Sequence, residues 1–182
     1  PSNCGTMLGP DYALLQPQYA QLHPRTPPRE GAARRIFVYF GGVDTDNLTG
    51  RTIAAFLSLG LDHVVVDVVI NSNGPHIDAV REQVMGRQHI TLHTRLPSLA
   101  PLMVKASLAI GGGGATSWER CCLGLPALVI TLADNQKPIA AELSRRNLVR
   151  WLGHTDDVGE EELARSLREV LEIGELRSWS QR

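Results

Sequence analysis

The sequence has few cysteines and almost no net charge. Its three cysteines are Cys4, Cys121 and Cys122, and no C-x-x-C spacing occurs, so neither a disulfide framework nor a zinc site is expected. Small reduced cysteines are typical of a cytoplasmic protein. The formal net charge of -1 argues against nucleic acid as a partner, because a phosphate backbone is usually met by clustered positive charge. The apolar runs are no longer than a strand, so no membrane span is expected.

The histidines provide no metal-binding pattern. None of the six forms a ligand spacing with a second histidine or a carboxylate, so we expect no metal ion and no cofactor. They are His23, His63, His76, His89, His93 and His154. The 182 residues, 43% of them hydrophobic, are sufficient for one domain with a substantial core.

Four consecutive glycines, Gly111 to Gly114, are the most informative stretch. They follow the apolar run 108–110 and precede helix-forming residues at 115–123, which predicts a buried strand that enters a tight turn and a helix. Glycines let the backbone approach a ligand and adopt positive φ, while the first N–H groups of a helix lack internal partners. The stretch therefore predicts an anion site.

The residues around this turn also predict a nucleotide. No lysine or arginine lies between Leu108 and Glu119, so main-chain N–H groups, hydroxyls and the helix dipole would hold a phosphate. The Glu119 carboxylate can accept hydrogen bonds from two vicinal ribose hydroxyls. An equal alternative is that Glu119 only complements the helix N-terminus. The candidate nucleotide-binding residues here are Gly112, Gly113, Gly114, Ala115, Thr116, Ser117 and Glu119.

Strands and helices alternate along the chain. This alternation predicts an α/β fold, a doubly wound parallel Rossmann-like sheet of about six strands. The expected strands are 36–40, 64–70, 90–93, 108–110, 127–132 and 148–151. The expected helices are 12–19, 48–59, 75–84, 96–105, 115–123, 136–146 and 160–173. Proline-rich residues 1–34 are expected to form a connector and linker, and residues 35–182 the binding domain.

A second glycine pair, Gly41 and Gly42, ends the first expected strand. It either forms a second phosphate loop or serves as an ordinary turn. Asp44, Asp46 and Asn47 offer caps for the next helix, and Asp44 and Asp46 would repel a phosphate. Asn47 is also a neutral donor and a candidate nucleotide-binding residue.

The fifth expected strand is followed by Asp134, Asn135 and Gln136. Asp134 or Asn135 is a good N-cap for the next helix. The Asn135 and Gln136 carboxamides can also donate to sugar hydroxyls and accept from them, which makes both candidate sugar-binding residues.

The stretch from Ala106 to Pro126, continuing at 132–136, resembles the C-terminal half of a known family. These are the UDP-2,4-diacetamido-2,4,6-trideoxy-β-L-altropyranose hydrolases of pseudaminic acid biosynthesis. They in turn resemble the lipid II-forming N-acetylglucosaminyltransferase of peptidoglycan synthesis. The resemblance extends to residues 8–15 and 40–49.

This resemblance implies the C-terminal half of a GT-B fold with UDP or a UDP-sugar as ligand. Both glycine loops would contact the diphosphate and Glu119 the ribose, while Asn135 and Gln136 would contact the sugar, with Asn135 also supporting catalysis. The family's general base is a histidine in a Gly-x-Gly-His motif of the N-terminal domain, and the sequence holds no such motif. We therefore expect that an N-terminal domain of the parent protein, outside these residues, supplies the base.

Three functions remain open at this point. The first is the UDP-binding half of a hydrolase that cleaves a UDP-linked diacetamido-trideoxyhexose to free sugar and UDP. The second is the donor-binding domain of a GT-B glycosyltransferase, and the third is a non-catalytic nucleotide-sugar-binding module of a larger protein. A Rossmann dehydrogenase is a weaker fourth, because the Gly-x-Gly-x-x-Gly fingerprint is incomplete.

Overall fold

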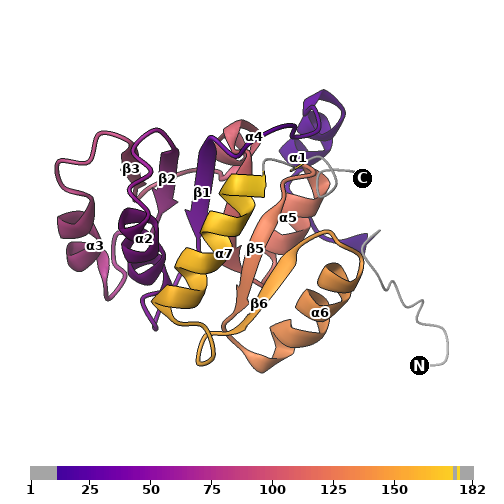
Figure 1. Ribbon diagram of the computed structural model, residues 1–182. Coiled ribbons are helices and arrows are strands. Elements are labelled where there is room, and N and C mark those ends of the chain that lie inside the picture. The colour runs from indigo at the N-terminus through magenta and orange to yellow at the C-terminus, as the bar shows by residue number, and fades with distance from the viewer. Residues whose placement is uncertain (1–11, 174–175, 177–182) are drawn as a thin grey trace.

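Six parallel strands form a single sheet in the computed structural model, which describes residues 12–173 and residue 176. Their order is β3-β2-β1-β4-β5-β6 (Figure 1). The strands are β1 Arg35–Tyr39, β2 Val65–Val69, β3 Ile90–His93, β4 Leu108–Gly112, β5 Ala127–Thr131 and β6 Arg150–His154. The order reverses between β1 and β4, so the predicted doubly wound parallel sheet is confirmed and its switch point lies there.

Helices cover both faces of the sheet. They are α1 Pro17–Leu22, α2 Leu48–Ser58, α3 Ile77–Val84, α4 Ala100–Lys105, α5 Thr116–Cys122, α6 Lys137–Arg145 and α7 Glu160–Ile173, with short 3-10 turns η2 His23–Arg25 and η3 Asp134–Gln136. Residues of α2, α3 and α7 pack on one face, and those of α1, α4, α5 and α6 on the other. In Figure 1, α2 and α7 lie side by side in front of the sheet.

Continuous apolar runs make the central strands because both of their faces are covered. In β1, Ile36 and Val38 contribute to one core cluster and Phe37 to the other, and all three are buried. No helix in the described ranges is long and apolar enough to cross a membrane.

The largest differences from the predicted boundaries are at three elements, in two cases because a proline starts a helix rather than interrupting it. The first helix begins at Pro17 instead of residue 12, and α4 begins at Ala100 instead of residue 96, with Pro101 in its first turn. The fixed φ of proline suits a first turn, where its missing N–H is not needed. The sixth strand runs over Arg150–His154 rather than 148–151, with an irregularity opposite Val129 and Ile130.

Residues 12–34, which were predicted to belong to a connector, pack against the rest of the described chain. Tyr19 is buried in the core cluster that includes α4 and α5. The buried Arg29 side chain donates to the carbonyl oxygens of Met103 at 2.9 Å and Ala106 at 3.2 Å, and also to that of Leu123. These carbonyls lie at the carboxyl ends of α4 and α5, where helices leave acceptors without partners. Residues 8–11 of the stretch 8–15 that carries the resemblance lie outside the described residues, as does Cys4.

Candidate functional site

The candidate site lies at the carboxyl edge of the sheet. A cavity of about 410 Å³ opens beyond the ends of β1, β2 and β3, beside the first turns of α5. Four of the predicted nucleotide-binding residues line it: Gly41, Gly42, Thr116 and Glu119. The others lining it include Gln16, Tyr19, Tyr39, Asn71, Thr94, Arg95 and Ser98. The fold thus brings two loops together that are far apart in sequence, at the place where open parallel sheets bind ligands.

The backbone of the four-glycine run differs from the predicted tight turn. Gly111 and Gly112 belong to β4, and none of the four has a positive φ. Close packing requires glycine instead, because a Cβ on Gly111 would lie 2.3 Å from the Tyr39 carbonyl oxygen. A Cβ on Gly112 would lie 2.7 Å from Cδ1 of Leu132. Only from Gly113 onwards is the backbone a loop, which leads through Ala115 into α5.

The loop after β1 has the left-handed backbone expected of a glycine turn. Gly41 has φ +100°, and neither Gly41 nor Gly42 has an atom within 4 Å of an added Cβ. The predicted caps are confirmed at Asp44 and Asn47. The Asp44 carboxylate accepts from the N–H groups of Leu48 at 2.8 Å and Thr49 at 2.7 Å, and Asn47 Oδ1 accepts from Gly50 N at 3.1 Å. Asn47 does not line the cavity.

Glu119 presents a half-buried carboxylate to this cavity. Its Oε2 atom is buried and has no hydrogen-bond partner among the described residues. Burial raises the pKa of Glu119 above its usual value, opposed in part by the Tyr19 hydroxyl and the Arg120 guanidinium. Burial and the Glu119 charge also raise the pKa of Tyr39. A carboxylate oxygen that is desolvated and unpaired needs a donor, which a ligand hydroxyl would provide.

Arg120 was not among the residues predicted for the site, but it contacts both Gly112 and Ser117. Its side chain is 1% exposed, and Nη2 donates to the Gly112 carbonyl at 2.7 Å and to Ser117 Oγ at 3.0 Å. The buried Ser117 hydroxyl is therefore directed at Arg120. Burial lowers the pKa of Arg120 to about 10. The available signal was its place three residues after Ser117, on the same face of the helix.

The loop after β5 lies beside the glycine loop. Gln136 Oε1 accepts from Leu132 N at 3.0 Å, and the Gln136 side chain would touch a Cβ on Gly113 or Gly114. Asn135 is exposed. The predicted N-cap by Asp134 or Asn135 is wrong: a 3-10 turn continues into α6 without a side-chain cap, and Asp134 forms an ion pair with Lys137 at 2.6 Å. Asn135 and Gln136 do not line the 410 Å³ cavity.

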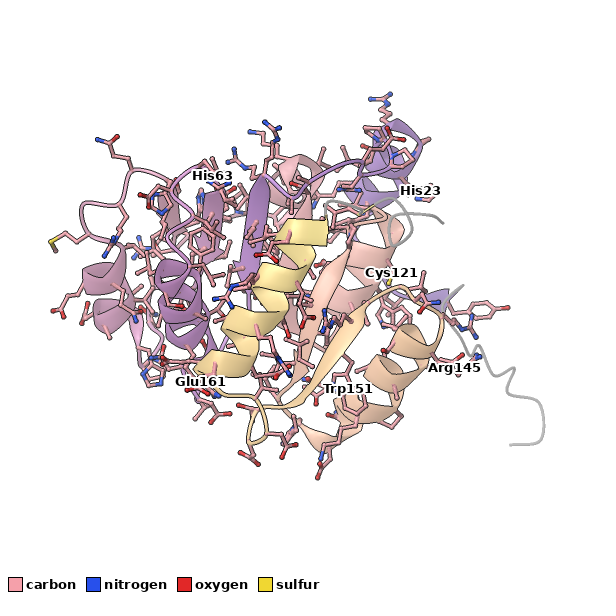
Figure 2. All side chains as sticks on the ribbon, in the orientation of Figure 1. His23, His63, Cys121, Arg145, Trp151 and Glu161 are labelled. Carbon is pink, nitrogen blue, oxygen red and sulfur yellow. The ribbon has the colours of Figure 1, made fainter. Side chains whose placement is uncertain are left out.

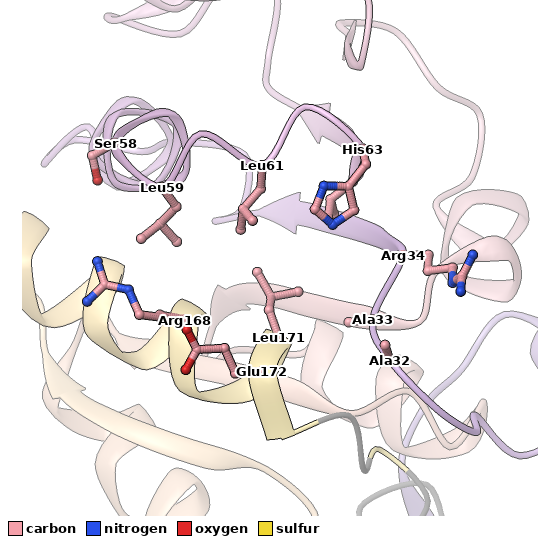
Figure 3. A pocket seen from close by; sticks show the side chains of 11 residues that line it. Ala32, Ala33, Arg34, Ser58, Leu59, Leu61, His63, Arg168, Leu171 and Glu172 are labelled. Carbon is pink, nitrogen blue, oxygen red and sulfur yellow. The ribbon is translucent and has the colours of Figure 1, made fainter.

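A second cavity, of about 520 Å³, lies at the opposite end of the sheet. Leu59, Leu61 and Leu171 face one another across it, with His63 and Arg168 nearby (Figure 3). Figure 2 shows His63 at the end where the strands begin and Glu161 near the end where they finish. Since ligands of open parallel sheets bind beyond the carboxyl ends of the strands, this cavity is not the candidate site.

The fold defines the class to which the chain belongs. A six-stranded parallel sheet in this order, with a site at its switch point, is a Rossmann-like α/β domain. Within the described residues, no group of three or more His, Cys, Asp or Glu side chains is arranged to hold a metal ion.

Comparisons with known proteins narrow that class to one half of a GT-B fold. No model of a known protein family matches the chain. The chain is similar to spore coat polysaccharide biosynthesis protein SpsG of Bacillus subtilis (strain 168), with 26% identity over 170 residues. The match covers 93% of this chain and 50% of that protein.

Two solved structures illustrate the likeness of fold. UDP-GlcNAc 2-epimerase from Neisseria meningitidis bound to UDP-GlcNAc gives a TM-score of 0.59 at 17% identity, over 85% of this chain and 40% of that chain. Spinosyn rhamnosyltransferase SpnG complexed with thymidine diphosphate gives 0.61 at 21% identity, over 83% and 40%. The chain therefore spans half or less of the length of each of these proteins.

Proposed function

We propose that the chain is the nucleotide-sugar-binding half of a two-domain enzyme and that its ligand is UDP or a UDP-sugar. The observation that carries this proposal is Glu119, which lines the cavity at the switch point and whose buried Oε2 atom has no hydrogen-bond partner among the described residues. A ribose offers two adjacent hydroxyl donors to such a carboxylate. The loops at Gly41–Gly42 and Gly113–Thr116 offer main-chain N–H groups to a diphosphate on either side.

The comparisons support this ligand class. The epimerase structure is bound to UDP-GlcNAc, and the rhamnosyltransferase structure is a complex with thymidine diphosphate. Both ligands are nucleoside diphosphates or derivatives of them, so the shared fold is consistent with a nucleoside diphosphate site here. The preference for uracil rests on the resemblance to the UDP-sugar hydrolases.

For the reaction, we propose hydrolysis of a UDP-linked diacetamido-trideoxyhexose to free sugar and UDP in pseudaminic acid biosynthesis. Attack of water on the sugar needs a positioned base. That base belongs to the N-terminal domain expected in the parent protein. We propose that the carboxamides of Asn135, which is exposed, and of Gln136, which lies near the glycine loop, contact the sugar, with Asn135 in a supporting role.

A second candidate is glycosyl transfer from the same donor site. The relative from Bacillus subtilis is named for polysaccharide biosynthesis, and one structural neighbour is a rhamnosyltransferase. Transfer and hydrolysis use the same half for the donor. They differ in what the other half presents to the sugar, an acceptor or a water molecule.

Calorimetric titration of the chain with UDP, ADP and GDP tests the proposed ligand. We expect UDP to bind more tightly than ADP and GDP, and Glu119→Ala to weaken UDP binding by about tenfold or more, as for lost charge-assisted hydrogen bonds. Glu161→Ala, at an exposed position in the first turn of α7, is the matched control and should leave the affinity unchanged. A folded chain that binds none of the three nucleotides would contradict the proposal.

A further inference from the structure

Arg120 is a buried cation that the described residues leave only partly paired. Its Nη2 atom has two acceptors, but Nε and Nη1 are buried without hydrogen-bond partners. In the described part of the chain it forms no ion pair. Burial lowers the pKa of Arg120, and the charge of Glu119, its neighbour in sequence, partly opposes this shift. A buried charge that is only partly paired is costly, because its remaining donors lose their hydration without a hydrogen bond in return.

The position of Arg120 relates this charge to the glycine loop. One acceptor, the Gly112 carbonyl, ends β4, and the other, Ser117 Oγ, lies in the first turn of α5. The guanidinium therefore joins the two sides of the loop formed by residues 113–115. Its Nη1 atom also lies 2.8 Å from the position of a Cβ on Gly111, so the first glycine of the run makes room for this side chain.

A purely structural role would not need a charge. A neutral donor could bridge the Gly112 carbonyl and the Ser117 hydroxyl. A neutral donor would also avoid the cost of burying a charge that is not fully paired. The buried positive charge under the loop is explained if an anion occupies the loop and offsets it, since charges interact strongly where water is excluded.

We propose that Arg120 is a positioning residue for an anionic ligand: it fixes the glycine loop and supplies the positive charge that a bound diphosphate neutralises. This inference rests on the proposed function and adds to it a residue that favours a negatively charged ligand. Arg120 acts through the loop and its potential, so it should favour UDP over the uncharged nucleoside uridine. It should contribute little to binding of the uridine moiety itself.

The test compares UDP, uridine and inorganic pyrophosphate as ligands of wild type, Arg120→Gln and Arg120→Lys, by calorimetry and ligand-observed NMR. Arg120→Gln keeps a donor and loses the charge, whereas Arg120→Lys keeps the charge. We expect Arg120→Gln to lose about tenfold or more in UDP affinity, as for a charge-assisted contact, with uridine affinity within about twofold. Arg120→Lys should retain UDP affinity within about threefold.

Arg29→Gln is the matched control. Arg29 is also buried, but its acceptors are the Met103, Ala106 and Leu123 carbonyls, away from the glycine loop. This variant should lower the melting temperature without changing the ratio of UDP to uridine affinity.

Each outcome separates this inference from the proposed function. Equal losses for UDP and uridine in Arg120→Gln would overturn the inference and leave nucleotide binding intact. Pyrophosphate binding that depends on Arg120, without UDP binding, would support the inference and refute the proposed nucleotide. If folded wild type binds none of the ligands, both fail. Should Arg120→Gln not fold, Arg120→Lys decides: retained UDP affinity supports the role of the charge, and a tenfold loss overturns it.

Discussion

The surroundings of Glu119 disfavour its ionised carboxylate in the ligand-free protein. They leave its Oε2 atom without a hydrogen bond, which a ligand hydroxyl would donate. Burial raises its pKa above 4.5, the value of an unperturbed glutamate. A raised pKa in the folded state means that the stability associated with this group is fully present below the unfolded pKa and is lost as pH rises through the folded pKa. At neutral pH, therefore, ionised Glu119 destabilises the ligand-free protein.

We predict that Glu119→Gln is at least as stable as wild type at pH 7 and loses less stability between pH 4.5 and pH 7. Urea unfolding at several pH values measures this difference. The same variant should bind UDP about tenfold more weakly, and the loss should shrink with 2′-deoxy-UDP, which lacks one of the hydroxyls that Glu119 would accept from.

Glu142 provides a control of the opposite sign. Hydrogen bonds from Arg145 and Arg146 lower the pKa of Glu142 to about 2. Its contribution is present above the unfolded pKa of 4.5 and is lost as pH falls through about 2. Glu142→Gln should therefore be slightly less stable than wild type at pH 7, with unchanged UDP affinity. A Glu119→Gln variant that is clearly less stable at pH 7 would show that the Tyr19 hydroxyl and the Arg120 charge stabilise the carboxylate more than burial destabilises it.

At the scale of elements, β4 and β1 approach so closely that the glycine at their contact has no substitute. A Cβ on Gly111 would lie 2.3 Å from the Tyr39 carbonyl oxygen and 2.8 Å from Arg120 Nη1. The first of these atoms is backbone and cannot move without disturbing the pairing of Tyr39 with Gly111. We predict that Gly111→Ala lowers the free energy of unfolding by about 2 kcal/mol or more, in the range for overpacked cores.

Gly42→Ala is the comparison that separates packing from ligand contact. An added Cβ at Gly42 meets nothing within 4 Å, so the stability should change by less than about 0.5 kcal/mol. If the Gly41–Gly42 backbone contacts the diphosphate, this variant nevertheless weakens UDP binding. Gly159→Ala, which is equally open, controls for the substitution itself. Chemical denaturation and calorimetry give the two quantities, and a stable Gly111→Ala protein would contradict the packing argument.

The elements differ in how far sequence alone predicts them. β3 and α7 occur at the predicted residues, because alternating apolar residues or a long amphipathic repeat is a local signal. The predicted starts of α1 and α4 were wrong because a proline is compatible both with the first turn of a helix and with an interruption of a helix.

The lining of the candidate cavity could be predicted only in part. Gly41, Gly42, Thr116 and Glu119 could be assigned because strand-end loops of a parallel sheet converge. The reason for Gly111 could not be predicted, because it depends on its contact with Tyr39 of β1, which is about seventy residues earlier in the chain. Local spacing contains no information about such a neighbour.

At the scale of the whole molecule, one charged cluster joins three strands within the sheet. Asp67 of β2 is 1% exposed and accepts from Arg35 of β1, through Nε at 2.6 Å and Nη2 at 3.1 Å. It also lies 2.9 Å from Nε2 of His93 on β3. A buried carboxylate with three such contacts is stable only while its partners remain in place, so the cluster connects the β3 edge to the centre of the sheet.

Asp67→Asn should therefore lower the stability of the whole fold. The variant leaves the Arg35 guanidinium without its counter-charge, at a cost of about 2 kcal/mol, which is below the value for fully buried pairs because Arg35 is 35% exposed. Urea unfolding should show a lower midpoint with an unchanged slope, since the same surface is exposed. Asp78→Asn, which breaks an exposed pair with Arg81, should cost less than about 0.5 kcal/mol. Equal effects of the two variants would show that the buried cluster does not hold the strands together.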